Sequence, residues 1–364
     1  NARATGFAAS ATGTDSVASG VQGIANGVFA RAAGDFSVAF GRASFAPGTF
    51  VSSFGSATVT LQAAQPTVRQ LFAALLQYQP SRARGLPITG CDSLDALVQS
   101  LALPRKIMLM VPAGRAVDDI LHALVPLLSP GDIVIDGGNS HFPDTSRRVR
   151  MMESQGLLYV GAGVSGGEEG ALLGPAIMPG GSGAAWPSLK PVFQAIAART
   201  DDGMPCCDWI GEEGAGHFVK MVHNGIEYGD MQLICEVYDL MRKLLGLSAD
   251  EMHQVFRRWS EGALKSYLIE ITRDILATRD ADGLPLVDRI LDKAGQKGTG
   301  KWTGINALDL GIPLTLIGEA VFARCLSAQK DERVKAAEFL ARPEKAFSGD
   351  KQVMINAIRN ALYA

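Results

Sequence analysis

Glycine recurs at every seventh position through the first part of the chain, and this spacing constrains the fold more than any other feature of the sequence. The glycines stand at positions 6, 13, 20, 27, 34, 41, 48 and 55, and an alanine, or Ser53 in the last copy, precedes each by two residues. A helix would lose about 1 kcal/mol at every such glycine, and no large apolar seam of the coiled-coil kind compensates. Short alternating pieces such as residues 37–40 instead favour stacked β coils with glycine turns.

This repeat, in residues 1–60, resembles the head of trimeric autotransporter adhesins. The resemblance implies a left-handed parallel β-roll that trimerises on a bacterial surface. A low-complexity segment without such a fold is the alternative, because repeats of alanine and glycine arise easily.

Composition excludes several classes of function. The 364 residues are 47% apolar and 20% charged, which is ordinary for two or three domains with sizeable cores. A net charge of -3 without a basic cluster argues against nucleic-acid or membrane-surface partners. No run approaches the roughly 18 apolar residues that span a bilayer, and no charged-then-apolar leader opens the chain. The first residue is Asn1, which is compatible with a fragment of a longer protein.

The cysteines favour a reducing compartment. Their number is odd, no CxxC occurs, and one pair is adjacent, which fits free thiols in the cytoplasm better than a disulfide framework or a metal site. The five are Cys91, Cys206, Cys207, Cys235 and Cys325.

After about residue 61 the repeat stops and the pattern becomes that of an α/β domain. Residues 106–111 (KIMLMV) form a continuous apolar run, which predicts a strand buried on both faces of a parallel sheet. Ser93 is a predicted helix cap. The other predicted elements are helices at 67–77, 93–101, 117–127 and 145–155, and strands at 132–136 and 156–160.

Three successive predicted strands end in glycine-rich turns, at residues 112–114, 137–140 and 161–168. In an open doubly wound sheet, ligands bind outside the carboxyl ends of the strands, where glycine lets backbone N–H groups approach closely. The pattern therefore predicts a ligand site at this edge, although glycine turns also occur in α/β proteins without one.

From residue 214 onward the sequence predicts helices joined by short loops. The predicted helices cover residues 216–245, 248–259, 262–277, 286–293 and 314–329. Within the first, five polar residues share one face at spacings of i, i+3, i+4, i+7 and i+8: Lys220, His223, Asn224, Glu227 and Tyr228. This stripe has the residue types for acid/base chemistry, or else it is the solvated face of an amphipathic helix.

The loop at 295–302 nearly matches a phosphate-binding Walker A motif. Trp302 stands where the motif needs Ser or Thr, and a helix rather than a strand is expected to lead in, so a nucleotidase is not predicted. An anion site remains, formed by backbone N–H groups with Lys297 and Thr299. Arg324 is a candidate for a bidentate phosphate contact. The alternative for Arg324 is a surface salt bridge with Glu319 or Asp331.

These segments together resemble 6-phosphogluconate dehydrogenase, from about residue 67 to residue 364. The matching motifs follow one another in the family's order: LMVPAG at 109–114, IDGGNSHFPDT at 135–145, GAGVSGGEEGA at 161–171, GAGHFVKMVHNGIEYGDMQ at 214–232, AGQKGTGKWT at 294–303 and EAVFARCLSAQKDER at 319–333. Related 3-hydroxyacid dehydrogenases share the GxSGG turn but lack the KGTGKW loop. The presence of that loop in this chain points to a phosphorylated sugar acid as the substrate.

The two resemblances together imply three parts: a β-roll-like heptad repeat (1–60) from the adhesin resemblance, and from the dehydrogenase resemblance a partial NADP-binding domain with an incomplete doubly wound Rossmann-type sheet (61–213) and a truncated helical substrate and dimerisation domain (214–364). The dehydrogenase resemblance implies a cytoplasmic homodimer of the pentose phosphate pathway that uses NADP to oxidise and decarboxylate 6-phosphogluconate to ribulose 5-phosphate. No metal is implied.

The resemblance also assigns roles to residues. Lys220 would be the base that takes the hydroxyl proton, and Glu227 would protonate C1 of the enediol. The substrate would be held by Asn139, Ser165, Gly166, Gly167, Glu168, His223, Asn224, Tyr228, Lys297, Thr299 and Arg324, of which the last three and Tyr228 would bind its phosphate. The cofactor would contact Met110, Val111, Pro112, Ala113 and Asn139.

Two departures from the family pattern affect the expected activity. The family's opening strand, GxGxxG turn and helix have no counterpart before residue 67, and residues 65–67 lack the arginine that contacts the 2′-phosphate of NADP. The chain also ends at Ala364, before the family's second helical part and the tail that enters the partner subunit. We therefore expect a weakly active or inactive enzyme. The alternatives are a surface adhesin head joined to a non-functional dehydrogenase portion, and a protein that binds the sugar phosphate without turnover.

Overall fold

The computed structural model describes short strands within residues 1–59, for their backbones alone, and then residues 91, 93–167, 170, 173–340 and 347–364. By internal contacts the chain divides into two compact units, Asn1–His217 and Phe218–Ala364. The helix predicted at 67–77 lies outside the described residues.

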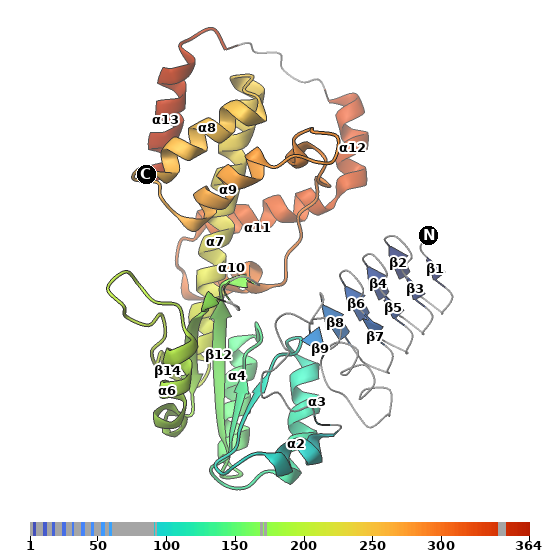
Figure 1. The fold of residues 1–364 in the computed structure, drawn as a ribbon, viewed down its shortest axis with the longest axis vertical. Coiled ribbons are helices and arrows are strands. Elements are labelled where there is room, and N and C mark those ends of the chain that lie inside the picture. Colours follow the sequence, from blue (N-terminus) through green and yellow to red (C-terminus); the bar gives the residue numbers. More distant parts are fainter. Residues whose placement is uncertain are drawn as a thin grey trace. The chain divides into compact units, whose positions relative to one another are not determined.

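The strands of the glycine repeat pair in two sheets, with orders β1-β3-β5-β7 and β2-β4-β6-β8-β9 (Figure 1). Except for the last, antiparallel pair of β8 and β9, each strand pairs in parallel with the strand two heptads further on, as Arg3 does with Val17 and Ser10 with Ile24. The strands are β1 (Arg3–Ala4), β2 (Ser10–Thr12), β3 (Val17–Ala18), β4 (Ile24–Asn26), β5 (Arg31–Ala32), β6 (Val38–Phe40), β7 (Phe45–Ala46), β8 (Ser52–Phe54) and β9 (Thr58–Val59).

A mixed five-stranded sheet follows in the order β10-β11-β12-β13-β14. The first three strands are parallel, β13 runs antiparallel to β12, and β14 runs parallel to β13. The sheet therefore resembles a Rossmann sheet in which β13 and β14 run opposite to the first three strands, and the wholly parallel arrangement expected around residues 106–111 does not extend across it. The strands are β10 (Lys106–Leu109), β11 (Ile133–Asp136), β12 (Leu158–Ser165), β13 (Ala176–Gly181) and β14 (Gly211–Glu212).

Helices cover both faces of this sheet, as two separate apolar clusters show. One cluster joins α2, α3 and α4 to β10, β11 and β12 through residues such as Val117, Leu121 and Val134. The other joins α6 to the opposite face through Ile133, Leu189 and others. The helices are α2 (Leu94–Ser100), α3 (Arg115–Leu124) with the 3-10 turn η1 (Val125–Leu127), α4 (Phe142–Glu153), η2 (Gly183–Ala185) and α6 (Trp186–Ile196). The predicted cap is confirmed, because Ser93 Oγ accepts from the Ala96 N–H at 3.1 Å.

Two predictions about the strands are wrong. Residues 106–111 are not buried on both faces: β10 ends at Leu109, its residues alternate between exposed and buried, and Met108 is 42% exposed. Among the described strands β10 lies at one end of the sheet, and a continuous apolar run does not reveal that position. The third glycine-rich segment is not a turn from residue 161, because β12 continues through Ser165 in pairs with β13. The turn begins at Gly166, whose φ is 135°.

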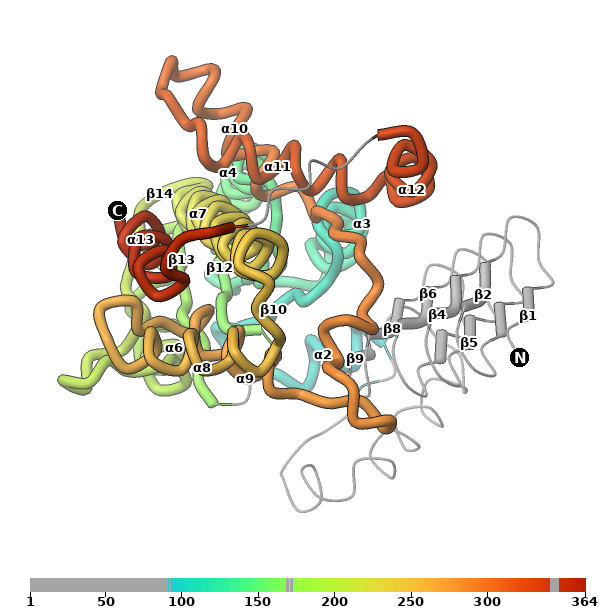
Figure 2. Tube along the Cα trace, turned by 90° about the horizontal axis from the view of Figure 1, so that it is seen from above, coloured from blue at the N-terminus to red at the C-terminus, as the bar shows by residue number. Residues whose placement is uncertain are grey.

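The second unit is helical. Its core joins α8, α9 and α13 to the end of α7, and α8 and α9 lie side by side (Figures 1 and 2). Its elements are α7 (Ala215–Asp239), which begins in the first unit, the π-helical turn η3 (Leu240–Leu244), α8 (Ala249–Ser260), α9 (Tyr267–Ala277), η4 (Leu286–Asp288), α10 (Thr299–Leu310), α11 (Thr315–Ala328), α12 (Lys330–Phe339) and α13 (Lys351–Tyr363).

The predicted helices at 216–245, 248–259 and 314–329 are confirmed within a few residues at their ends. The helix predicted at 262–277 begins only at Tyr267, because the Ser266 side chain caps it by accepting from Ile269 N. The helix predicted at 286–293 is wrong, since only a 3-10 turn forms there. No helix of the described residues has both the length and the apolar character that crossing a bilayer needs.

Candidate active site

The polar stripe of α7 is a hydrogen-bonded cluster in the second unit. Lys220 Nζ donates to Asn224 Oδ1 at 2.8 Å, and His223 Nδ1 lies 3.4 Å from the same oxygen. His223 Nδ1 also lies 3.7 Å from a carboxylate oxygen of Glu227. The helical spacing read from the sequence thus brings these four side chains together.

Lys220 is unusually buried for a lysine, with 6% of its surface exposed. Burial lowers the pKa of its amine, since the charged form loses hydration, and the nearby negative charge of Glu227 opposes this shift. The simple alternative for this face, a stripe directed into water, does not fit a buried lysine. A buried amine of lowered pKa is a candidate general base.

A pocket of about 470 Å³ opens beside His223 and Glu227. Its other lining is largely apolar and comes from α7 (Ile226, Asp230, Leu233, Ile234), from residues 263–269 and from Leu362. Burial also raises the pKa of the Asp230 carboxyl, although the electrostatic interaction with His223 opposes that shift.

Helix α10 brings the glycine-rich loop to α7. Asn224 Nδ2 lies 3.4 Å from Thr299 Oγ1, and Thr303 Oγ1 donates to the Met221 carbonyl at 3.0 Å. The two helices approach each other closely at Gly225, where an added Cβ would lie only 3.0 Å from Thr303 Oγ1. Gly298 enters the helix with φ of 103°, a left-handed conformation that favours glycine. The first turn of α10 therefore lies beside the Lys220 cluster.

Arg324 of α11 stacks on the ring of Tyr228, with its guanidinium carbon 4.0 Å from the ring centroid. Its Nη1 donates to the Gly295 carbonyl at 2.8 Å, at the start of the glycine-rich loop. Among the described residues it forms no ion pair with Glu319 or Asp331, so the surface salt-bridge interpretation is wrong. Lys297 is exposed in the same loop.

In the first unit, Asn139 is exposed at the carboxyl end of β11, between Gly138 and the buried Ser140. Ser165 ends β12, and Gly166 and Gly167 follow with φ of 135° and 61°. The left-handed conformation explains why glycine stands at both positions. Glu168 lies outside the described residues.

The predicted cofactor contacts lie at the carboxyl end of β10, next to β11 in the sheet. Met110, Pro112 and Ala113 are exposed, whereas Val111 is buried. A Cβ on Gly137 would lie 2.4 Å from Met108 Cε, the end of an exposed and flexible side chain, and 3.4 Å from the Leu109 carbonyl oxygen, so the turn after β11 lies close to β10. Within the described residues the GxGxxG spacing occurs at residues 161–166, but it runs along β12 and does not form the turn between a strand and a helix that holds a dinucleotide pyrophosphate.

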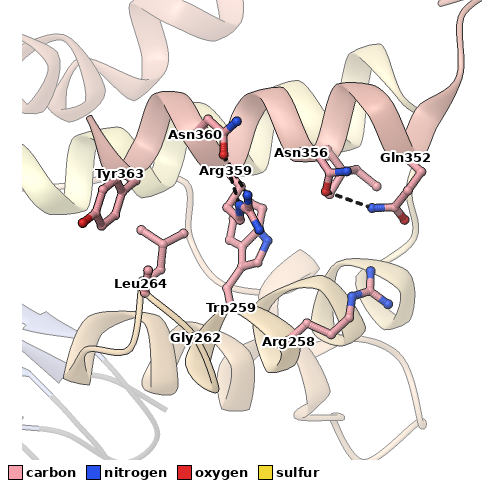
Figure 3. Close-up of a pocket in the computed structure, with 11 residues that line it drawn as sticks. Arg258, Trp259, Gly262, Leu264, Gln352, Asn356, Arg359, Asn360 and Tyr363 are labelled. Atoms are coloured by element: carbon pink, nitrogen blue, oxygen red, sulfur yellow. Dashed lines mark hydrogen bonds between the residues drawn. The ribbon is translucent and has the colours of Figure 1, made fainter.

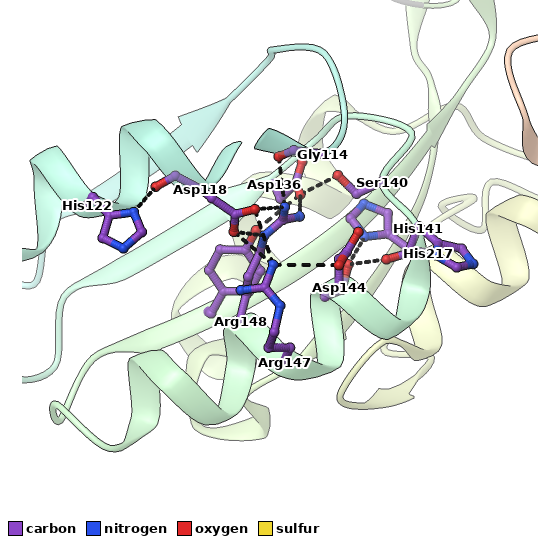
Figure 4. Close-up of polar contacts among 12 residues, drawn as sticks. Gly114, Asp118, His122, Asp136, Ser140, His141, Asp144, Arg147, Arg148 and His217 are labelled. Atoms are coloured by element: carbon purple, nitrogen blue, oxygen red, sulfur yellow. Dashed lines mark hydrogen bonds and ion pairs between the residues drawn. The ribbon is translucent and has the colours of Figure 1, made fainter. Parts of the chain in front are cut away.

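Sequence reasoning missed a buried polar cluster in the first unit, which Figure 4 shows. Asp136 and Arg148 are 0% exposed and His217 is 1% exposed. His217 Nδ1 lies 2.7 Å from Thr145 Oγ1, and burial lowers the pKa of its imidazole, against the opposing effect of the Asp136 carboxylate. The available signal was the Asp that ends the apolar strand at 132–136.

Another cavity of the second unit, of about 610 Å³, contains none of the predicted site residues. It lies between the end of α8 and α13 and is lined by Arg258, Trp259, Asn356, Arg359 and Tyr363 among others (Figure 3). Across the described part of the chain, no group of His, Cys, Asp and Glu side chains is arranged to hold a metal ion.

Fold and site together define a dehydrogenase architecture: a Rossmann-like mixed sheet followed by a helical unit that carries a buried lysine. Residues 55–211 match the NAD binding domain of 6-phosphogluconate dehydrogenase, and residues 216–364 match the C-terminal domain of 6-phosphogluconate dehydrogenase. These two segments belong to the two domain families of that enzyme.

Individual relatives agree with this assignment. The chain is 59% identical over 285 residues to the decarboxylating 6-phosphogluconate dehydrogenase of Homo sapiens, which covers 78% of the chain and 59% of the relative. It is 57% identical over 288 residues to that of Schizosaccharomyces pombe, covering 79% of the chain and 58% of the relative. The chain thus spans about three fifths of the length of these curated relatives.

Solved structures give the same result. A Plasmodium falciparum 6-phosphogluconate dehydrogenase, described in its apo form and with NADP+ and 6-phosphogluconate, matches with a TM-score of 0.72 and 40% identity, over 80% of this chain and 63% of that chain. A 3-hydroxyisobutyrate dehydrogenase from Salmonella typhimurium matches with a TM-score of 0.50 and 20% identity, over 74% of this chain and 83% of that chain, and shows the fold alone.

Proposed function

We propose that this chain acts on 6-phosphogluconate by the NADP-dependent oxidative decarboxylation for which its relatives are named. The observation that carries the proposal is Lys220, a buried amine of lowered pKa that lies beside Asn224 within the segment matching the C-terminal domain family. Oxidation of a secondary alcohol needs such a base for the hydroxyl proton.

Each step of the proposed reaction is assigned to a particular residue. Lys220 takes the proton of the substrate hydroxyl, and the nicotinamide, when bound, accepts the hydride. The resulting 3-keto acid loses carbon dioxide, while protonated Lys220 stabilises the developing enolate oxygen. Glu227 then gives a proton to C1 of the enediol, which yields ribulose 5-phosphate.

Binding is assigned to two groups of residues. Lys297, Thr299 and Arg324, with Tyr228 beneath the Arg324 guanidinium, receive the phosphate; the stacking and the Gly295 hydrogen bond support this assignment because they fix the orientation of Arg324. The carboxylate and hydroxyls are assigned to Ser165, Gly166, Gly167, Glu168, His223 and Asn224, and Asn139 to the space between substrate and nicotinamide.

A turnover assay tests this function. We expect the full chain with 6-phosphogluconate and NADP to produce NADPH far more slowly than a relative of complete length, because the described residues lack a pyrophosphate-binding turn. Absorbance at the NADPH band measures the rate. A rate equal to that of a complete relative would contradict the expected impairment, and substrate binding without NADP binding or turnover would indicate the binding-only alternative.

The phosphate clamp has its own test. Arg324→Met should weaken binding of 6-phosphogluconate by about ten- to a hundredfold, the cost of one charge-assisted contact of about 1.5–3 kcal/mol. Affinity for unphosphorylated gluconate should stay within about threefold, as that ligand lacks the group concerned. Calorimetric titration of both ligands against both proteins measures this. An equal loss for the two ligands would remove Arg324 from the phosphate site.

For residues 1–60 we propose the β-roll-like repeat, and for the enzyme portion a cytoplasmic homodimer. The parallel pairing of strands two heptads apart supports the repeat. A surface adhesin head joined to a silent dehydrogenase portion is the competing function. It predicts trimers and no turnover, so sedimentation analysis of the full chain beside the turnover assay separates the two.

A further inference from the structure

The turn that carries Asn139 is tethered to one buried carboxylate on both sides. Asp136 Oδ1 accepts from the Gly138 N–H at 3.0 Å, and Asp136 Oδ2 accepts from Ser140 Oγ at 2.6 Å. The residues before and after Asn139 are therefore held by the same side chain, and Asn139 itself remains exposed. Gly137 N also donates to the Leu109 carbonyl at 2.9 Å, which fixes the start of the turn to β10.

Arg148 connects this carboxylate to the neighbouring turn. The side chain comes from α4 and is 0% exposed, and its Nη1 lies 3.6 Å from Asp136 Oδ2. Its Nη2 donates to the Gly114 carbonyl at 2.9 Å, and its Nε and Nη2 donate to the two oxygens of Asp118, in the first turn of α3. The buried Arg148 guanidinium thus contacts residues in or beside both turns that follow β10 and β11, namely Gly114 and Asp136 (Figure 4).

This arrangement costs free energy unless every charge is paired, because burying a carboxylate and a guanidinium removes both from water. Ordinary turns after strands need no such charges; glycine alone would suffice. The charges do make the turn geometry rigid, since a charge-assisted hydrogen bond restrains both distance and direction.

We propose that Asp136, Ser140 and Arg148 form a positioning cluster that sets the orientation of Asn139 relative to the turn at residues 111–114. The three residues act through the turn backbone and touch neither substrate nor cofactor. The role rests on the proposed function, because Asn139 and residues 110–113 are the positions assigned to the nicotinamide side of the site.

The structure offers a matched pair of variants to test this. Ser140 Oγ and Tyr159 Oη both donate to the same atom, Asp136 Oδ2, at 2.6 and 3.1 Å. Ser140 belongs to the turn, whereas Tyr159 belongs to β12 and is 0% exposed. Ser140→Ala and Tyr159→Phe each remove one hydroxyl from this carboxylate, so a purely structural cluster predicts similar consequences for both.

We expect Ser140→Ala to speed amide hydrogen exchange in residues 137–141 by about tenfold, the effect of losing one hydrogen bond. In the full chain it should lower kcat by about tenfold while KM for 6-phosphogluconate changes by less than about threefold, since transition-state geometry rather than binding is disturbed. Tyr159→Phe should change exchange in this segment and kcat by less than about threefold despite a similar loss of thermal stability, and Ser140→Thr should restore both values.

Equal effects of the two variants on exchange would overturn the positioning role, and so would unchanged exchange in Ser140→Ala. Hydrogen-exchange mass spectrometry measures the protection of residues 137–141 whether or not the chain has catalytic activity. Absence of NADPH production by the unmodified chain would instead count against the proposed function, so the two failures are distinguishable.

Discussion

Lys220→Met should abolish NADPH production, with a loss of about a thousandfold or more in kcat, because the variant retains the volume of the side chain but has no base for the hydroxyl proton. Lys220→Arg should be equally inactive, since a guanidinium is not deprotonated in proteins and cannot accept the proton. Steady-state rates of the two variants and the unmodified chain, each at saturating 6-phosphogluconate, measure this. A Lys220→Arg variant with appreciable turnover would show that charge at this position suffices.

The same amine predicts the pH dependence. Burial lowers the pKa of Lys220 below the ordinary 10.5, so the neutral, reactive form is gained as pH rises through that lowered pKa. The rate should therefore increase with pH on its acid side and then level off. The free energy of unfolding should also increase with pH, because the unfolded chain binds the Lys220 proton more tightly than the folded chain does. Buried Lys220 therefore destabilises the folded state most below its lowered pKa, and this destabilisation disappears above 10.5.

Lys220→Met should consequently remain folded at neutral pH, which is the control for its lost activity. Circular dichroism and thermal unfolding of both proteins provide that check. If Lys220→Met were both inactive and unfolded, the role of the amine would be decided by the activity of Lys220→Arg and by the pH profile. A rate independent of pH across the lowered pKa would contradict the general-base assignment.

The stripe on α7 was predictable because helical periodicity is local. Lys220, His223, Asn224 and Glu227 recur at i, i+3, i+4 and i+7, so the helix alone brings them to one face. Burial of Lys220 was not predictable from that spacing, because a polar stripe reads the same whether water or other chain segments cover it. The difference decides whether the lysine is a base or a surface charge.

For β10 and β11 of the sheet, the strands were predictable from the sequence but their exposure was not. The strand at 132–136 was predicted and is buried at all four positions of β11, but the run at 106–111 has the same apolar character and forms the partly exposed β10. Apolar content reports the tendency to form a strand, whereas exposure depends on the strand's place in the sheet order. Helix α10 was missed because TGKWTGINALDL carries little amphipathic periodicity, although it supplies Thr299 to the candidate site.

The cluster around Asp136 was missed for a related reason. Asp136 and Arg148 are 12 residues apart in the sequence and meet only because α4 returns along β12, the strand next to β11. A charged residue in a short α/β segment is ordinarily a surface residue, and nothing local distinguishes a buried pair. Tertiary contact alone reveals that the turn carrying Asn139 rests on these charges.

The start of α7 is fixed by glycine, and Gly216→Ala should be the most destabilising single methyl addition in this region. A Cβ at this position would lie 2.3 Å from the carbonyl oxygens of both Gly161 and Met178 and 2.7 Å from Gly180 N. All three are backbone atoms of β12 and β13, so no side-chain rotation relieves the clash and the helix must move off the sheet. We expect a loss of about 3 kcal/mol or more in the free energy of unfolding.

Gly304→Ala is the matched control, because Gly304 is also inside a helix, α10, and a Cβ there would meet nothing within 4 Å. It should raise stability by about 0.5–1 kcal/mol, since alanine loses less backbone entropy in a helix than glycine does. Denaturant unfolding of the three proteins measures both values. A Gly216→Ala variant as stable as the unmodified chain would mean that α7 has room to shift on β12 and β13. Lys220 lies one helical turn from this contact, so such freedom would also argue against an accurately placed base.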